Sequence, residues 1–265
     1  MRFPLRLTAD LTKALIARKL RGASGPPPIL LIRPVEQANL SHLDSGEISN
    51  NTKAGTELLA SVRESLAPVV WIGGAEPLSH PEIGQLTRCI AGIGRHVFLE
   101  TDGSLLRRRI HEFRPVSQLF LTVQLNGLEK SHDLLAGRDG VFQLAVEGIR
   151  AAKLSGFFIC VHALMDEQTK LAEIAELIRF TQTLDVDGFM ISRAAGASRT
   201  ANRDEEVQPR KIAEARHLLG NIWWERFSAL VQTALHGERQ PAHAGGVGRS
   251  VVQEEDTSEE GVKVA

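Results

Sequence analysis

Short apolar runs, separated by helix-spaced apolar positions, dominate the first two hundred residues. Six runs stand out, at residues 29–34, 69–74, 96–101, 119–124, 157–164 and 188–192. Their apolar positions are nearly continuous, which is typical of parallel strands covered on both faces. Between most of them, apolar residues recur at i, i+3 and i+4, which predicts helices around 58–66, 86–93, 142–149 and 171–178. The connection at 104–113 is shorter and more charged, and its helical pattern is the least regular.

Strand and helix that alternate in this way predict right-handed βαβ units. Such units close into a full or partial barrel, or form a doubly wound sheet. In either architecture ligands bind at the carboxyl ends of the strands. The sequence is polar and rich in glycine at three of these ends, with GGAEP at 73–77, TDG at 101–103 and NG at 126–127.

The pattern divides the chain into four parts. We expect an N-terminal helix and linker at 1–28, the barrel at 29–195, a helical extension at 196–237, and a tail at 238–265 whose composition predicts disorder. In the extension, Trp223 and Trp224 lie in a helical pattern with Phe227. Core packing or a partner surface is favoured there over a cofactor site.

Charge and composition exclude several classes of function. The chain has 31 basic and 32 acidic residues, so nothing indicates a nucleic-acid surface. No apolar run reaches the ~20 residues of a membrane span, and we expect a soluble, cytoplasmic protein. Cys89 and Cys160 lie in apolar segments, which favours buried thiols over a disulfide.

Residues 8–21 allow two interpretations. The segment is amphipathic and carries Lys13, Arg18, Lys19 and Arg21. A packed or solvated helix is favoured, and the alternative is a helix that makes peripheral contact with a membrane surface.

Five phrases, which cover about residues 4–195, resemble the radical S-adenosylmethionine (radical SAM) superfamily. They are KLRG with PPILLIRPVEQANLSHLDSGEI, then APVVWIGGAEPLSHPEI, FLTVQLNGLEKSHD, GVFQLAVEGIRAAKLSGF and LDVDGFMIS. Within the superfamily they resemble most the hopanoid-biosynthesis proteins of the adenosylhopane synthase type. The resemblance implies a partial (β/α)6 barrel of the TIM-like kind, with a 4Fe-4S cluster and SAM as cofactors.

The loop after the first strand departs from the family pattern. The family carries CxxxCxxC there, and its three thiolates hold the cluster. In this chain the three positions are Ala38, His42 and Ser45. A methyl group, an imidazole and a hydroxyl do not replace soft thiolates around iron, so we expect the cluster to be absent.

Other family positions are partly kept. The segment GGAEP resembles the family's Gly-Gly-Glu-Pro motif near the SAM amine and supplies Gly73, Gly74, Glu76 and Pro77, with Ala75 where the second glycine is expected. Two further cofactor-site positions are changed: Asp102 replaces an Asn, and Asn126 replaces an acid. Both precede glycine, so plain turns explain them equally well. For GGAEP, the alternative is a strand-to-helix turn capped near Ser79.

The leading hypothesis is a radical SAM-fold pseudoenzyme, a binding or regulatory protein with a protein partner or an isoprenoid-lipid ligand. One alternative is an active radical SAM enzyme whose cluster is held with help from His42 or from a partner. Another is a non-radical enzyme that uses Glu76, Asp102 and His42 for acid–base chemistry.

The sequence does not favour three further types of site. A divalent-metal site formed by Glu36, His42, Asp44 and Glu47 is less favoured than solvated loop carboxylates. No GxSxG or GxGxxG motif points to a serine hydrolase or a Rossmann site.

Overall fold

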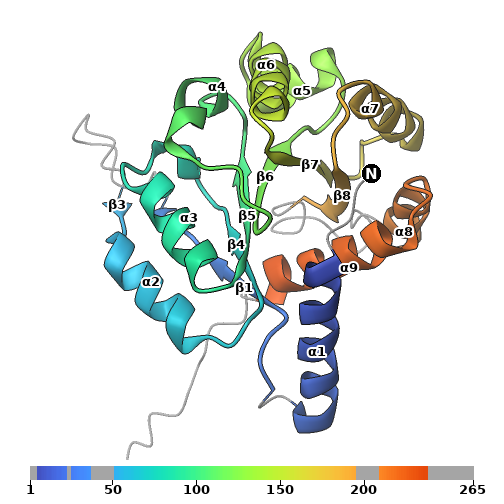
Figure 1. The fold of residues 1–265 in the computed structure, drawn as a ribbon. Helices are drawn as coiled ribbons and strands as arrows, with labels where there is room; N and C mark the ends of the chain where they lie inside the picture. The colour runs from blue at the N-terminus through green and yellow to red at the C-terminus, as the bar shows by residue number, and fades with distance from the viewer. Residues whose placement is uncertain (1–4, 23–24, 37–50, 195–208, 238–265) are drawn as a thin grey trace, which may run out of the picture.

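One curved parallel sheet with helices on its outer face forms the centre of the molecule (Figure 1). The computed structural model describes residues 5–22, 25–36, 51–194 and 209–237. The six strands of the sheet, in spatial order, are β1 (Ile29–Ile32), β4 (Val69–Ile72), β5 (His96–Thr101), β6 (Leu119–Gln124), β7 (Phe158–Met165) and β8 (Gly188–Arg193). All neighbouring strands pair in parallel. The predicted partial barrel is therefore confirmed, and every predicted apolar run contains a strand.

The helices in the connections form the outer layer of the half barrel. They are α2 (Gly55–Glu64), α3 (Ile83–Gly92), α4 (Leu106–Arg109), α5 (Glu129–Ala136), α6 (Val141–Leu154) and α7 (Leu171–Thr183), with 3-10 turns η3 (Pro77–Ser79) and η4 (Ile110–Glu112). Helix α5 was not predicted, because its apolar side chains are few and mostly exposed. Leu66 and Ile93 lie beyond the ends of α2 and α3 and are exposed, so the predicted apolar faces extended too far.

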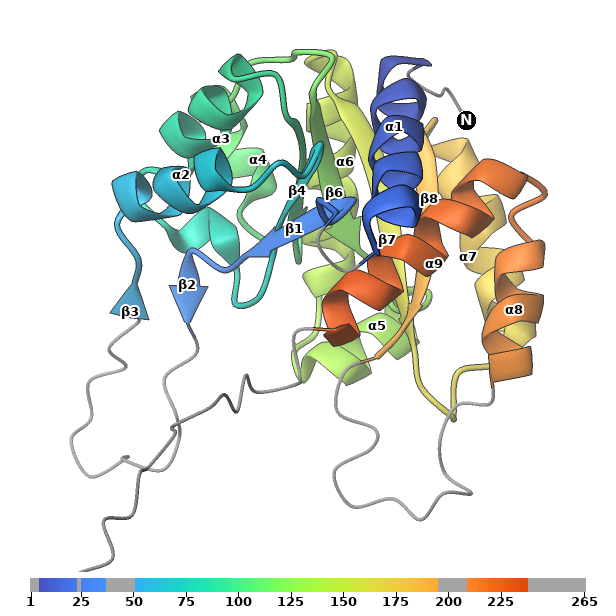
Figure 2. The same cartoon turned by 90° about the horizontal axis from the view of Figure 1, so that it is seen from below.

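The open side of the half barrel is covered by helix α9 (Ile222–Gly237), which packs against both edge strands, β1 and β8. In Figure 2, α1 and α9 lie between α2 and α3 on one side and α7 and α8 on the other. Trp224 and Phe227 are each 1 % exposed, and the Phe227 ring lies 5.0 Å from that of Phe98 in β5. The core-packing interpretation of Trp224 is thereby confirmed. Helix α8 (Pro209–His217) precedes α9.

Aromatic rings fill the interior of the sheet. Trp71, Phe98 and Phe120 are partners in the strand register and stack, with centroids 5.6 and 4.5 Å apart. Residues two positions further along each strand point to the same face. These positions are polar on two strands, with Glu100 on β5 and Thr122 on β6, so the interior changes from apolar to polar toward the carboxyl ends.

Helix α1 (Leu5–Arg21) packs at the amino ends of the strands. Its Leu7, Leu11 and Ala14 are buried, and Asp10 contacts His96, the first residue of β5, at 3.1 Å. The inner face of the predicted N-terminal helix is therefore packed. None of the helices in the described ranges is long and apolar enough to span a bilayer.

The remaining described elements are a two-stranded antiparallel pair, β2 (Val35–Glu36) and β3 (Asn51–Thr52), on either side of residues 37–50. Both cysteines are free: Cys160 is buried in β7, as expected, whereas Cys89 on α3 is only half-buried.

Candidate functional site

The loop after β4 is held to the end of β5 by the Glu76 carboxylate. One carboxylate oxygen accepts hydrogen bonds from the Leu78 amide at 2.9 Å and the Thr101 hydroxyl at 2.8 Å. The other accepts from the Asp102 amide at 2.8 Å. Glu76 thus caps η3 and bridges two strand ends, which fits the strand-to-helix turn, although the cap is Glu76 and not Ser79.

Burial and the neighbouring Asp102 raise the pKa of Glu76 to about 7, against hydrogen bonds from Asp102, Thr101 and Leu78 that lower it. A carboxyl group with a pKa near neutrality can both give and take a proton at physiological pH. It therefore has the properties of an acid–base group, although three donors already occupy it.

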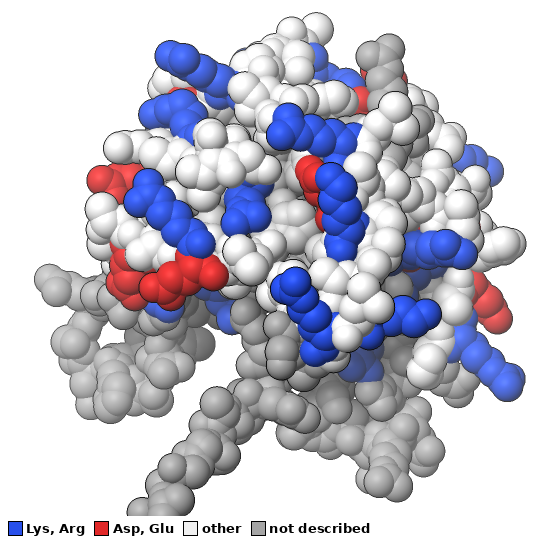
Figure 3. All heavy atoms as spheres, turned by 60° about the horizontal axis from the view of Figure 1, so that its bottom comes forward, with Lys and Arg blue, Asp and Glu red and all other residues white. Residues whose placement is uncertain are grey.

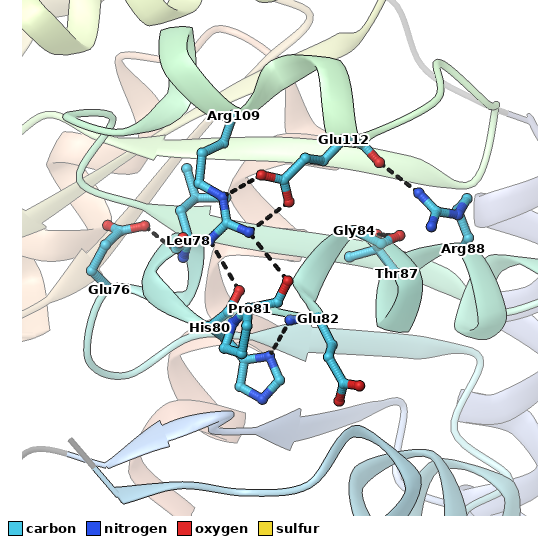
Figure 4. Close-up of polar contacts among 10 residues, drawn as sticks. All are labelled: Glu76, Leu78, His80, Pro81, Glu82, Gly84, Thr87, Arg88, Arg109 and Glu112. Atoms are coloured by element: carbon cyan, nitrogen blue, oxygen red, sulfur yellow. Dashed lines mark hydrogen bonds and ion pairs between the residues drawn. The ribbon is translucent and has the colours of Figure 1, made fainter. Parts of the chain in front are cut away.

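Arg109, at the end of α4, clamps the same loop from outside (Figure 4). Its guanidinium donates to the carbonyl oxygens of Leu78 and of His80, the latter at 3.0 Å. Glu112 accepts from Arg109 at 2.5 and 2.6 Å, and this contact lowers the pKa of Glu112. Arg109 was not singled out in the sequence, because nothing in the pattern connects residue 109 to the turn at 77–81.

A pocket of about 410 Å³ opens between the carboxyl ends of β5 and β6 and helix α5. Its lining residues are Asp102, Ser104, Gln124, Asn126, His132, Leu135, Ala136, Arg138 and Val141. The volume lies within the ~300–1,000 Å³ of typical small-molecule sites. Among these lining side chains Asp102 is the single acid and Arg138 the single full cation, so the pocket offers opposite charges at one site.

His132 presents an unpaired donor in this pocket. Its Nδ1 accepts a hydrogen bond from the Asn126 amide at 3.2 Å, so the proton of a neutral ring sits on Nε2. Burial lowers the pKa of His132, against the Asp133 and Asp102 charges that raise it, which favours the neutral ring. The side chain is 5 % exposed, and Nε2 finds no hydrogen-bond partner within the described chain. A buried N–H group without a partner is costly, so a ligand acceptor would relieve it.

Asn126 and Asp102 both fix turns and line the pocket. The Asn126 side-chain oxygen accepts from the Leu164 amide at 3.0 Å and joins the ends of β6 and β7. Asp102 accepts from the Ser104 amide at 2.8 Å, which closes the turn after β5. Their turn roles therefore do not exclude contact with a ligand, because each residue also borders the cavity.

A buried polar network lies inside the barrel below the β4 loop. Glu100 contacts His162 Nδ1 at 2.6 Å and accepts from Trp71 Nε1 at 3.0 Å. Burial acts to raise the pKa of Glu100, but His162, Gln124 and Trp71 together hold it below its usual value. A Cβ atom on Gly73 would lie 2.9 Å from a Glu100 oxygen, so the loop approaches this carboxylate closely enough to require glycine.

The residues predicted for the site fall into two groups. Asp102 and Asn126 line the pocket, whereas Gly73, Gly74, Glu76 and Pro77 form the adjoining loop and are not among the lining residues. His132 and Arg138 were missed. The signal for His132 was its place six residues after Asn126, in a segment whose helix was not predicted.

The cluster-loop positions Ala38, His42 and Ser45, and Asp44 and Glu47 with them, lie outside the described residues. In the described part of the chain, no group of three His, Cys, Asp or Glu side chains is placed to hold a metal ion.

The radical SAM superfamily model matches residues 53–181, from before α2 into α7. Two curated relatives are the pre-heme d1 synthase of Dinoroseobacter shibae and the AdoMet-dependent heme synthase of Methanosarcina barkeri. The first is 22 % identical over 73 % of this chain and 50 % of the relative, the second 24 % over 68 % and 51 %. The chain is thus similar to radical SAM proteins over this range.

The chain spans about half the length of the curated relatives it matches. Among solved structures, Streptococcus suis SuiB bound to the precursor peptide SuiA superposes with a TM-score of 0.58 at 17 % identity, over 78 % of this chain and 48 % of SuiB. SuiB bound to S-adenosylmethionine gives a TM-score of 0.56, over 82 % and 49 %. At such identity the similarity establishes the fold alone.

Proposed function

We propose that this chain binds S-adenosylmethionine, or a similar adenosyl ligand, in the pocket between β5, β6 and α5, and does not cleave it reductively. The proposal that the ligand is not cleaved rests on the number of cysteines in the chain. The chain has two cysteines in all, whereas three thiolates hold the family's cluster. Cys160 is buried in a strand and burial raises its thiol pKa well above the usual value, while Cys89 borders a small pocket between α2 and α3.

The donors at the family's cluster positions do not fit a 4Fe-4S cluster. Ala38 offers no ligand atom, and a serine hydroxyl is a poor substitute for a thiolate. No radical step is therefore assigned to this chain, and its role is binding or regulation.

The pocket has the chemistry to hold the amino-acid part of the ligand. An α-amino and an α-carboxylate group carry opposite charges, which match Asp102 and Arg138. The Nε2–H group of neutral His132 would donate to a carboxylate or ribose oxygen. Bound SAM would supply a sulfonium and an adenosyl group, and the chain's own residues orient them.

A second candidate is acid–base chemistry at the same mouth, favoured by the pKa of about 7 at Glu76. It requires that a ligand displace one of the three donors that Glu76 now accepts from.

The resemblance in sequence predicts a hopanoid or other isoprenoid-lipid pathway. The curated relatives above, together with the Fe-coproporphyrin III synthase of Methanosarcina barkeri, are named for heme and porphyrin synthesis. Tetrapyrroles and isoprenoid lipids are therefore both candidate ligands. A peptide is a candidate partner, because SuiB was solved with a bound precursor peptide.

The test is anaerobic reconstitution with iron and sulfide, followed by iron counting and calorimetric titration with S-adenosylmethionine. We expect no stoichiometric cluster, measurable SAM binding, and about tenfold weaker binding for His132→Ala, since one hydrogen bond to a charged group is lost. Gln143→Ala, which removes an exposed amide of α6 outside the pocket, is the matched control. A full cluster with formation of 5′-deoxyadenosine would refute the pseudoenzyme, and absence of SAM binding would refute the ligand assignment.

A further inference from the structure

Helix α1 exposes large apolar side chains on its outer face, although its inner face is buried. Leu7 and Leu11 are in the core, whereas Ile16 and Leu20 are 54 % and 81 % exposed and Leu15 is 39 % exposed. Ile16 and Leu20 are four residues apart and so lie on the same side of the helix. Exposed apolar side chains that adjoin on one helix face often mark an interaction surface.

The same helix is strongly basic. It carries five cations and one acid: Arg6, Lys13, Arg18, Lys19, Arg21 and Asp10. Asp10 is engaged with His96 at 3.1 Å and lies 4.0 Å from both Arg6 and Lys13. Lys13 and Lys19 lie three residues before and after Ile16 and so flank it, whereas Arg18 and Arg21 lie on the side of the buried Ala14. Figure 3 shows Lys and Arg side chains spread over this face of the molecule, with fewer Asp and Glu.

We propose that the outer face of α1 docks on a bilayer that contains anionic lipids. Ile16 and Leu20 would enter the boundary between headgroups and acyl chains, and Lys13 and Lys19, which flank them on the helix surface, would contact lipid phosphates. Amphipathic helices with this combination lie in the plane of the interface. Each Lys or Arg near an anionic surface strengthens binding about fivefold.

Charge alone would also fit other polyanions, but the aliphatic side chains favour a bilayer. A nucleic acid has no apolar layer that would cover Ile16 and Leu20. The acidic segment at 254–260 of this chain matches the charge but contains no large apolar side chain.

The surface lies at the opposite end of the barrel from the candidate ligand pocket. Helix α1 contacts His96, where β5 begins, whereas Asp102 in the pocket follows the end of β5. A docked molecule would thus keep its pocket open to the aqueous side, so this inference does not depend on the proposed function.

The test is flotation of the full chain with vesicles of phosphatidylcholine alone or with about one third phosphatidylglycerol. We expect binding to the anionic vesicles, loss of binding at high salt, and at least about 25-fold weaker binding for the variant Lys13→Glu/Lys19→Glu. Leu20→Ser should weaken binding about tenfold, because less apolar surface enters the interface. The control Arg150→Glu/Arg179→Glu makes the same change of charge at exposed positions of α6 and α7 and should bind as wild type does.

Circular dichroism establishes that each variant is folded before it is scored. No binding of the wild type to anionic vesicles, or an equal loss in the control variant, would overturn the proposal. A peptide of residues 250–262 or a DNA duplex that binds in a Lys19-dependent way, while vesicles do not, would also overturn it and identify a different occupant.

Discussion

Replacement of His162 by leucine isolates the energetics of the charge buried below the β4 loop. Glu100 is fully buried, and His162 is the largest of the favourable contacts that keep its pKa low. His162→Leu leaves the carboxylate with Trp71 and Gln124 as its partners in a site that water does not reach. Removal of one member of a buried pair typically costs about 3–5 kcal/mol.

The pH dependence has a defined sign. The pKa of Glu100 is depressed in the folded state, so its contribution to stability is present above the pKa of the unfolded chain and is lost as pH falls through the folded value. In His162→Leu only Trp71 and Gln124 offset the burial, so the pKa of Glu100 should rise. The loss of unfolding free energy relative to the wild type should therefore be smaller in acid. Urea unfolding at neutral pH and at about pH 4.5 measures both effects.

The double variant Glu100→Leu/His162→Leu separates the interaction between the two side chains from the cost of burying them. An apolar pair of similar volume often replaces a buried ion pair without loss, so the double variant should be more stable than either single variant. The reasoning would be refuted if His162→Leu lowered the free energy of unfolding by less than about 1 kcal/mol. Strict additivity of the two single changes in unfolding free energy would also refute it.

Three further predictions concern packing, the loop clamp and the titration of Glu76. Gly188→Ala should lower the free energy of unfolding in urea by about 1–3 kcal/mol, because a Cβ atom there would lie 2.1 Å from the Trp224 ring. Adding Trp224→Phe, which has a smaller ring, should recover part of that loss. No recovery would mean that the strain lies elsewhere. Arg109→Ala should speed amide exchange in residues 78–80 while Arg107→Ala, which removes an exposed cation, should not; equal exchange in both variants would contradict the clamp. The raised pKa of Glu76, about 7, means that the folded state binds the extra proton, so wild-type stability should fall by about 2–3 kcal/mol as pH rises from 4.5 to above 7. Glu76→Gln should abolish that slope in thermal melts, and an unchanged slope would assign it to another group.

The sequence predicted the fold well because parallel strands covered on both faces leave near-continuous apolar runs. The runs at 119–124 and 96–101 match β6 and β5 residue for residue. Helix α5 escaped prediction because Leu134 and Leu135 are exposed and the helix has little apolar periodicity to detect.

The site was only partly predictable. Asp102 and Asn126 were found because they follow strands directly, and the carboxyl ends of parallel strands share one edge. His132 lines the same pocket from a connecting helix, and Arg109 reaches a turn nearly thirty residues away. Contacts of this kind depend on how the connections cross the sheet, which local patterns do not encode.

Helix α9 also has a consequence for the order of folding. It covers the exposed sides of both β1 and β8, so the first strand of the sheet gains its outer neighbour only from the last described helix. Contacts between such distant segments form late, because the loop that they close is long. During synthesis the edge of β1 would stay uncovered until residues 222–237 leave the ribosome, and in that interval the chain would be most exposed to strand-to-strand aggregation.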